Sequence, residues 1–355
     1  MVKQDYQQDR NKPVNLLLKE DKMKTLLISQ SQIKEMITTK EVIELCDKTF
    51  QGMGDGTVLN PTKVNLDLGE MDTYPHYKGF MNAMPAYIGW QDVAGIKWAG
   101  GFLGKRKEMG LPYITSLILL IDPQIGNFRA VLDGAHITNM RTGAQTAVAL
   151  KYLLKKKEIT VGLYGAGMQG RTQIKAISEL FNISKLFVYD IAQSAIENYI
   201  SEMKDVVHGE IIGVDSPEKA GAADVVVSVT QSQDKFIKKE WLKEGTIYFP
   251  MGSYQECEDE VLLSANKIIV DHIGQCLHRG ALRDLNEAGE ITEETLYSTI
   301  GELAAGKKEA NIDNDDLVVC IPIGTGAMDI SVANEIYKKA KQNEANFKQF
   351  DFIEG

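Results

Sequence analysis

The chain has 355 residues, which predicts about two domains, and its 44% hydrophobic and 25% charged content excludes wholesale disorder. Lysine and arginine number 39 against 49 aspartates and glutamates, and this net charge of −10 argues against binding to a nucleic-acid backbone. The longest apolar runs are far shorter than the roughly 18 residues of a membrane span, the N-terminus lacks the apolar segment of a signal peptide, and the four cysteines are scattered. We therefore expect a cytoplasmic protein with no membrane or nucleic-acid partner.

The first part of the chain predicts an α+β region after a polar N-terminal extension, residues 1–22, which we expect to be frayed. Apolar residues at helical spacing predict one helix over Ser31–Phe50, and a second, long helix is predicted over His136–Leu154. The strands, which look antiparallel, are predicted at Thr25–Ile28, Lys63–Leu68, Gly95–Ala99, Ile114–Ile121 and Phe128–Leu132.

From Glu158 onward short apolar strands alternate with helical stretches, which predicts a parallel sheet with helices on both faces. A final helix is predicted over Met328–Lys341. The predicted strands are Ile159–Tyr164, Lys185–Asp190, Glu210–Val214, Asp224–Val229, Thr246–Pro250 and Lys267–Asp271, with a further apolar run at Leu317–Ile323.

A glycine motif follows the first of these strands and opens the next helix. Gly165 suits a tight turn, Gly167 lets the backbone approach a pyrophosphate, and Gly170 allows close helix–strand packing. Asp190, twenty residues further on, can accept from the ribose hydroxyls and would repel a 2′-phosphate, which favours NAD over NADP. Glycines that merely form a tight turn are the alternative, and FAD would suit a motif nearer the N-terminus. The predicted fold class is α/β, a Rossmann-type doubly wound parallel sheet plus an α+β domain.

Two cationic residues stand in apolar surroundings, where a charge is costly unless it is paired or used. Lys97 lies in a strand-like segment of small and apolar residues, and Arg141 begins an apolar helix, where its planar fork could bind a carboxylate. Lys63 is a weaker candidate. The histidines show no spacing typical of metal ligands, so we expect no metal site.

Several short segments together resemble the ornithine cyclodeaminase/μ-crystallin family, over about Met23 to Gln342. The matching pieces are Met84-Pro-Ala-Tyr87, Ala94-Gly-Ile-Lys-Trp98, Gly110-Leu-Pro112 with Thr115, Ile137-Thr with Arg141-Thr142, Gly165-Ala-Gly-Met-Gln169, Arg279-Gly-Ala-Leu282, Glu302-Leu with Ala305-Gly-Lys307, and Gly324 with Asp329.

The resemblance implies a substrate and dimerisation domain over residues 23–150, completed by residues 325–345, and an NAD-binding domain over residues 151–324. Residues 346–355 are then a tail. It also implies a homodimer that acts on a small amino acid or a cyclic imine.

The resemblance also assigns roles to single residues. Lys97 would be the catalytic lysine, with Tyr254 as a second catalytic candidate. Lys63, Arg141 and Thr115 would bind the substrate. The cofactor would be bound by Thr142, Gly165, Ala166, Gly167, Met168, Gln169, Gly170, Asp190, Thr230 and Gly324.

Two positions depart from the family pattern. Lys63 stands where many members have an arginine, and Tyr254 stands where cyclodeaminases and alanine dehydrogenases have an aspartate. Tyrosine titrates near pH 10, so it is a poor base at neutral pH, although it can donate a proton. The lead function is conversion of ornithine to proline and ammonia. The alternatives are a ketimine or pyrroline-carboxylate reductase, an alanine-type dehydrogenase, and a non-catalytic μ-crystallin-like binding protein.

Overall fold

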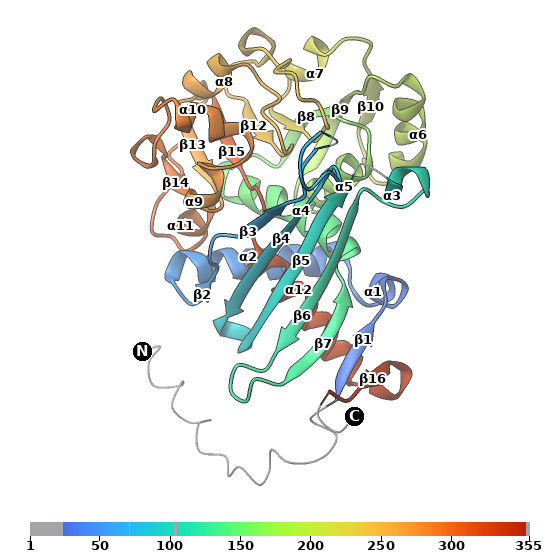
Figure 1. Ribbon diagram of the computed structural model, residues 1–355. Coiled ribbons are helices and arrows are strands. Elements are labelled where there is room, and N and C mark those ends of the chain that lie inside the picture. The colour runs from blue at the N-terminus through green and yellow to red at the C-terminus, as the bar shows by residue number, and fades with distance from the viewer. Residues whose placement is uncertain (1–23, 71, 103–104, 353–355) are drawn as a thin grey trace.

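The computed structural model describes residues 24–70, 72–102 and 105–352, so the predicted extension, residues 1–22, lies outside the described residues. Figure 1 shows two sheets in separate halves of the molecule, with helix α12 (Gly326–Lys341) running along the back of the first sheet. We call the first the mixed sheet and the second the parallel sheet.

The mixed sheet has the order β16-β1-β7-β6-β5-β4-β2, with β3 paired to β4. Its pairs are antiparallel except β1 with β7, so the predicted antiparallel pattern fails at that one pair. Its strands are β1 (Thr25–Ile28), β2 (Val58–Leu59), β3 (Val64–Asp67), β4 (Gly79–Ile88), β5 (Val93–Phe102), β6 (Ile114–Ile121), β7 (Phe128–Asp133) and β16 (Lys348–Phe350).

Side-chain alternation gives the mixed sheet two distinct faces. Met84, Lys97 and Ile118 lie opposite one another on adjacent strands, and all three are buried. We call this the inner face. Helix α12 packs on it, because a Cβ on Gly326 would lie 2.4 Å from the carbonyl oxygen of Met84. The other face, with Trp98, is the outer face.

The predicted helix over Ser31–Phe50 is wrong in one respect, because the structure has two helices there. Helix α1 spans Gln30–Met36 and α2 spans Thr39–Asp55. Thr38 starts the second helix, because its side chain accepts from the Glu41 amide while the Glu41 carboxylate accepts from the Thr38 amide. This capping box outweighs the continuous apolar periodicity.

The parallel sheet has the order β10-β9-β8-β11-β12-β15-β13-β14, and every pair in it is parallel, which confirms the Rossmann-type α/β class. Its strands are β8 (Glu158–Tyr164), β9 (Asn182–Tyr189), β10 (Glu210–Gly213), β11 (Val225–Ser228), β12 (Ile247–Pro250), β13 (Lys267–Val270), β14 (Ser298–Thr299) and β15 (Val318–Ile321).

The longer helices of this half are α4, α5 and α6, and shorter turns fill the loops. Gly143 lets α4 approach α5, because a Cβ there would lie 2.2 Å from the carbonyl oxygen of Thr172. The remaining helices are α3 (Lys105–Glu108), α4 (Ala135–Leu153), α5 (Met168–Leu180), α6 (Gln193–Met203), α7 (Glu218–Gly221), α8 (Asp259–Leu263), α9 (Ile273–Cys276), α10 (Arg283–Glu287) and α11 (Ile300–Ala304), with 3-10 turns η4 (Gly89–Gln91), η5 (Lys239–Trp241), η6 (Gly280–Leu282), η7 (Glu293–Thr295) and η8 (Glu344–Asn346).

The chain returns to the mixed sheet after β15. Helix α12 packs on the inner face, and β16 pairs antiparallel with β1 through Thr25 and Phe350. Part of the predicted tail, residues 346–355, is therefore a strand. The domain boundaries themselves remain predictions.

Candidate functional site

The glycine motif lies at the carboxyl edge of the parallel sheet, between β8 and α5, where the strand order reverses. Open sheets bind ligands at such a point. Gly165 has a φ of +104°, a conformation that favours glycine, and a Cβ on Gly170 would lie 2.3 Å from the Gly165 carbonyl oxygen. A Cβ on Gly167, by contrast, would meet nothing within 4 Å, so the space above this glycine is open.

The first turn of α5 offers backbone amides to a ligand. Gly167 is its N-cap and supplies no side-chain acceptor to those amides. Helix N-termini of this kind bind phosphate groups. The neighbouring Met168 is 61% exposed, whereas Ala166 is buried. The side-chain amide of Gln169 donates to Asn139 Oδ1 at 2.9 Å. The arrangement therefore fits the pyrophosphate of a dinucleotide.

Asp190 directly follows β9 and holds the glycine loop. Its Oδ2 accepts from the Ala166 amide at 2.8 Å and its Oδ1 from the Ala192 amide at 3.0 Å. Each carboxylate oxygen can accept a further hydrogen bond. Its predicted contact with the ribose is compatible with this geometry and stays a prediction.

Two threonines of the predicted cofactor set flank the same edge. The Thr142 hydroxyl donates to the Thr138 carbonyl oxygen within α4, on the side of α4 that packs against α5. Thr230 follows β11, and its amide and hydroxyl both donate to Glu256 Oε1, the amide at 2.8 Å.

Glu256 is a buried carboxylate that the sequence analysis missed. Besides Thr230 it accepts from the Ser228 hydroxyl at 2.7 Å, and it also lies against Gly252, which follows β12. Burial raises the pKa of Glu256, against the lowering effect of these donors. Glu256 therefore ties together the loops that follow β11 and β12. No local motif marks it, since its partners are distant in sequence.

The second part of the site is a buried ion cluster around Asp329 of α12. Asp329 Oδ1 accepts from Lys97 Nζ at 2.9 Å and from Arg141 Nε at 3.2 Å. Asp329 Oδ2 has no hydrogen-bond partner among the described residues. Burial lowers the pKa of Lys97 to about 8, which the Asp329 carboxylate only partly offsets. The structure thus brings Lys97 and Arg141 together, as predicted for the substrate site.

Lys63 joins this cluster from the start of β3. Lys63 directly precedes Val64, the first residue of β3 that pairs with β4. Its charge interacts with those of Asp271, Arg141 and Lys97. Its ammonium has no ion-pair partner among the described residues. Burial lowers the pKa of Lys63 to about 8, and the nearby Arg279 contributes.

Gly324 and Asp271 connect the cluster to the parallel sheet. The Gly324 amide donates to Asp271 Oδ2 at 2.7 Å, and a Cβ on Gly324 would lie 2.3 Å from Arg141 Nη1. Arg141 Nη1 in turn donates to Gln145 at 2.8 Å. Gly324 lies against Arg141, and its predicted role in cofactor binding stays a prediction.

Thr115, which was predicted to bind the substrate, lies on the face of the sheet opposite to Lys97, and its predicted role stays a prediction. Lys97 lies opposite Ile118 and Ala99 opposite Ser116, so alternation places Ser116 on the inner face and Thr115 on the outer face. The Thr115 side chain therefore faces away from Lys97. A shift of one residue along a strand moves a side chain to the other face of the sheet.

Tyr254 lies in the loop between β12 and α8 and is exposed, at 44%. Burial raises the pKa of Tyr113, and the nearby Tyr254 adds to this effect. No hydrogen bond links Tyr254 to Lys97 in the part of the chain that the structure describes. Its predicted catalytic role stays a prediction.

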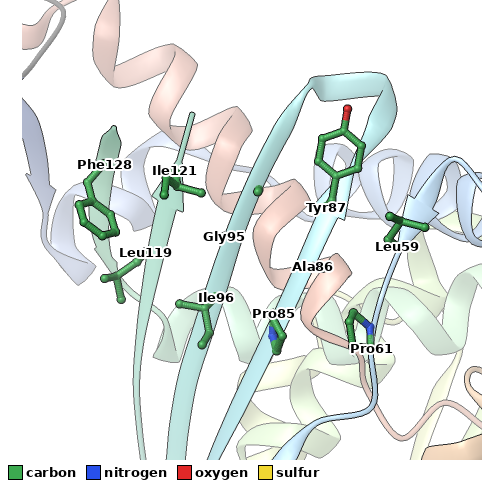
Figure 2. Close-up of a pocket in the computed structure, with 11 residues that line it drawn as sticks. Leu59, Pro61, Pro85, Ala86, Tyr87, Gly95, Ile96, Leu119, Ile121 and Phe128 are labelled. Atoms are coloured by element: carbon green, nitrogen blue, oxygen red, sulfur yellow. The ribbon is translucent and has the colours of Figure 1, made fainter. Parts of the chain in front are cut away.

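An apolar groove of about 430 Å³ lies on the outer face of the mixed sheet, away from Lys97. Figure 2 shows Pro85, Ile96 and Leu119 along it. It contains no charged side chain, so it lacks the groups that would bind a zwitterion. Among the described residues no cluster of histidine, cysteine, aspartate and glutamate could hold a metal ion, and no helix is long and apolar enough to cross a membrane.

The hydrogen bonds of Glu256 to the loops after β11 and β12 lead to a prediction. Glu256→Ala should lower the free energy of unfolding by about 1–3 kcal/mol, because buried donors of Ser228 and Thr230 lose their acceptor. It should also weaken NADH binding several-fold, because both loops border the nucleotide edge. Denaturant unfolding and NADH fluorescence titration measure these effects. Glu260→Ala, at an exposed position, is the control. If Glu256→Ala and the control give equal stability and equal NADH affinity, Glu256 does not hold the two loops.

Comparison with known proteins identifies the family. A model of the ornithine cyclodeaminase/mu-crystallin family matches residues 23–344. An alanine dehydrogenase of Archaeoglobus fulgidus is 31% identical over 330 residues, which cover 92% of this chain and 98% of that protein. A solved archaeal alanine dehydrogenase dimer with bound NAD has a TM-score of 0.86 at 30% identity, with 93% and 100% of the two chains covered.

A second solved structure is similarly close. The Thermococcus litoralis Δ(1)-pyrroline-2-carboxylate reductase, in complex with NADH and L-proline, has a TM-score of 0.83 at 29% identity, and the match covers 90% of this chain and 98% of that one. The family model and these relatives all extend over both sheets. The chain therefore belongs to the ornithine cyclodeaminase/mu-crystallin family.

Proposed function

We propose that the chain is an NAD-dependent oxidoreductase that transfers one hydride between the cofactor and the α-carbon of a small amino acid or its imine. The observation that carries this proposal is the buried Lys97–Asp329–Arg141 cluster beside the nucleotide edge. The cofactor-bound relatives support NAD, and their names, an alanine dehydrogenase and a pyrroline-carboxylate reductase, support single hydride transfer.

The residues of the cluster have different roles in the proposed reaction. Arg141 and Lys63 bind the substrate carboxylate. Asp329 and Gln145 accept from Nε and Nη1 of Arg141, whereas Nη2 has no hydrogen-bond partner among the described residues and can donate to the carboxylate. In oxidation Lys97 takes a proton from the substrate ammonium, and the neutral amine then loses its α-hydride to give the iminium ion. In reduction the iminium ion gains hydride and Lys97 returns the proton to the amine, which a pKa of about 8 permits near neutral pH. When bound, NAD accepts or supplies the hydride.

Cyclisation of ornithine, the lead from the resemblance, is less well supported by the site. That reaction needs a group that manages protons on two amines, and Tyr254 stands where the family places its aspartate. The second ammonium of ornithine would also enter a pocket that already holds Lys63, Lys97 and Arg141, and like charges at close range repel.

An activity screen tests the proposal. Amino acids are incubated with NAD+, and NADH is followed by absorbance while ammonia and proline are assayed in parallel. Net NADH with ammonia supports the oxidoreductase. Proline without net NADH would show cyclodeaminase activity instead, and tight NAD binding without any turnover would indicate a binding protein.

The lysine provides a sharper test of the site. Lys97→Ala should abolish turnover, because the proton acceptor is lost, and should leave the Kd for NADH nearly unchanged, because the nucleotide edge does not include Lys97. Lys40→Ala, an exposed lysine of α2, is the control for folding and activity. Turnover of Lys97→Ala at the control rate would refute the assigned role.

The two lysines also predict a pH dependence. With NADH present, affinity for pyruvate, a monocarboxylate analogue, should fall as the pH rises through about 8, because Lys63 and Lys97 then lose the charges that attract the carboxylate. In Lys63→Arg the fall should be shallower, because arginine stays protonated. Calorimetric titration between pH 6.5 and 9.5 measures this, and pH-independent affinity would contradict it.

We also propose that the chain is a homodimer, as the archaeal relative is, with the outer face of the mixed sheet at the interface. Trp98 and Leu117 lie opposite each other on β5 and β6 and are 52% and 48% exposed. They lie on the same outer face as the apolar groove of Figure 2. Large exposed apolar patches mark interaction sites.

Light scattering tests the interface. Leu117→Asp should shift the mass toward one chain, because it places a charge in the contact. Leu263→Asp, on the distant α8, changes an equally exposed leucine (49%) and should leave the mass unaltered. A wild-type mass of one chain, or an unaltered dimer in Leu117→Asp, would overturn this interface.

A further inference from the structure

The inner-face site contains more positive than negative charge. Lys63, Lys97, Arg141 and Arg279 face two buried carboxylates, Asp271 and Asp329. A zwitterionic amino acid is neutral overall, so binding one leaves the same surplus. Buried charges without compensation are costly, and the surplus favours a ligand with a further negative group.

Arg279 is the cation that neither the ion cluster nor the proposed reaction uses. It immediately precedes η6, after β13, and its Nη1 donates to Asn82 Oδ1 at 2.8 Å. The guanidinium has five N–H donors, and only this one has a hydrogen-bond partner among the described residues. Arg279 is half-buried, and this burial lowers the pKa of its guanidinium.

Asn82 fixes where this guanidinium lies. It projects from β4 to the inner face, two residues from Met84, which lies opposite Lys97. Diagonal neighbours of this kind have their Cα atoms roughly 7–8 Å apart. Asn65 Nδ2 donates to the same Asn82 oxygen at 3.0 Å, so the amide is oriented with its oxygen toward Arg279.

The backbone beside Arg279 adjoins the loop that carries Tyr254. A Cβ on Gly280 would lie 3.8 Å from the Gly252 carbonyl oxygen. Arg279 therefore lies between Asn82 on the inner face and this loop, and its charge interacts with that of Lys63. A substrate whose α-carboxylate is held by Lys63 and Arg141 would then extend its side chain toward Arg279.

We propose that Arg279, oriented by Asn82, binds a second carboxylate on the substrate side chain, so that the chain acts on an acidic α-amino acid or its imine. This rests on the proposed function for the reaction but names a substrate class that the reaction alone does not fix. Guanidinium and carboxylate pair through parallel N–H donors, which gives both strength and orientation. The simpler alternative, that Arg279 only joins the two halves through Asn82, predicts no preference among ligands.

Binding of oxo acids separates these readings without requiring turnover. With NADH present, the wild type should bind 2-oxoglutarate or oxaloacetate at least tenfold more tightly than pyruvate in calorimetric titration. Arg279→Gln should weaken dicarboxylate binding by about 10- to 100-fold, the usual range for a lost hydrogen bond to a charged group, and pyruvate binding by a much smaller factor. Arg279→Lys should recover part of the loss.

Arg283→Gln is the matched control, since Arg283 is an exposed arginine four residues away that pairs with Asp284. Its dicarboxylate affinity should equal that of the wild type. Equal losses for dicarboxylates and pyruvate in Arg279→Gln, or no dicarboxylate preference in the wild type, would overturn the inference even if alanine is oxidised. Selective dicarboxylate binding without NADH turnover of any amino acid would contradict the proposed reaction and not this site.

Discussion

One buried carboxylate holds the cations of the inner face in place. Asp329 accepts from both Lys97 and Arg141, and it lies on α12, which reaches the inner face only after the parallel sheet is complete. Removing one partner from such a buried group typically costs about 3–5 kcal/mol, because the remaining charge has no water around it. Asp329 and Asp271 together are still outnumbered by the four cations of the inner face. This surplus of positive charge would be reduced by a bound anion.

The site lies where the two sheets meet, and hydrogen bonds cross that junction. Arg141 binds Gln145, whose amide reaches Asp271 at the end of β13, while Arg279 from the parallel-sheet half binds Asn82 of the mixed sheet. The nucleotide edge and the cationic pocket are thus parts of one network. A carboxylate held by the pocket would have its α-carbon near the edge where the cofactor lies, which is the geometry that hydride transfer requires.

Local features were predictable from sequence because their causes are local. The glycine motif, the strands around it and the Asp190 position depend on contiguous residues, and the structure has them where they were predicted. Asp329 and Glu256 were not predictable as partners, since Asp329 is 232 residues from Lys97 and no spacing rule joins them. The face on which Thr115 lies was not predictable either, because composition identifies a strand but a shift of one residue in the register moves a side chain to the other face.

The order of the chain has a consequence for how this protein is made. All strands of the parallel sheet precede α12 in the chain. The parallel-sheet half can therefore fold from contiguous sequence as synthesis proceeds. The mixed sheet is translated first but must wait, because its inner face is covered only when α12 emerges from the ribosome. Until then Lys97 and Arg141 lack their counterion, so the mixed-sheet half can be completed only late in synthesis.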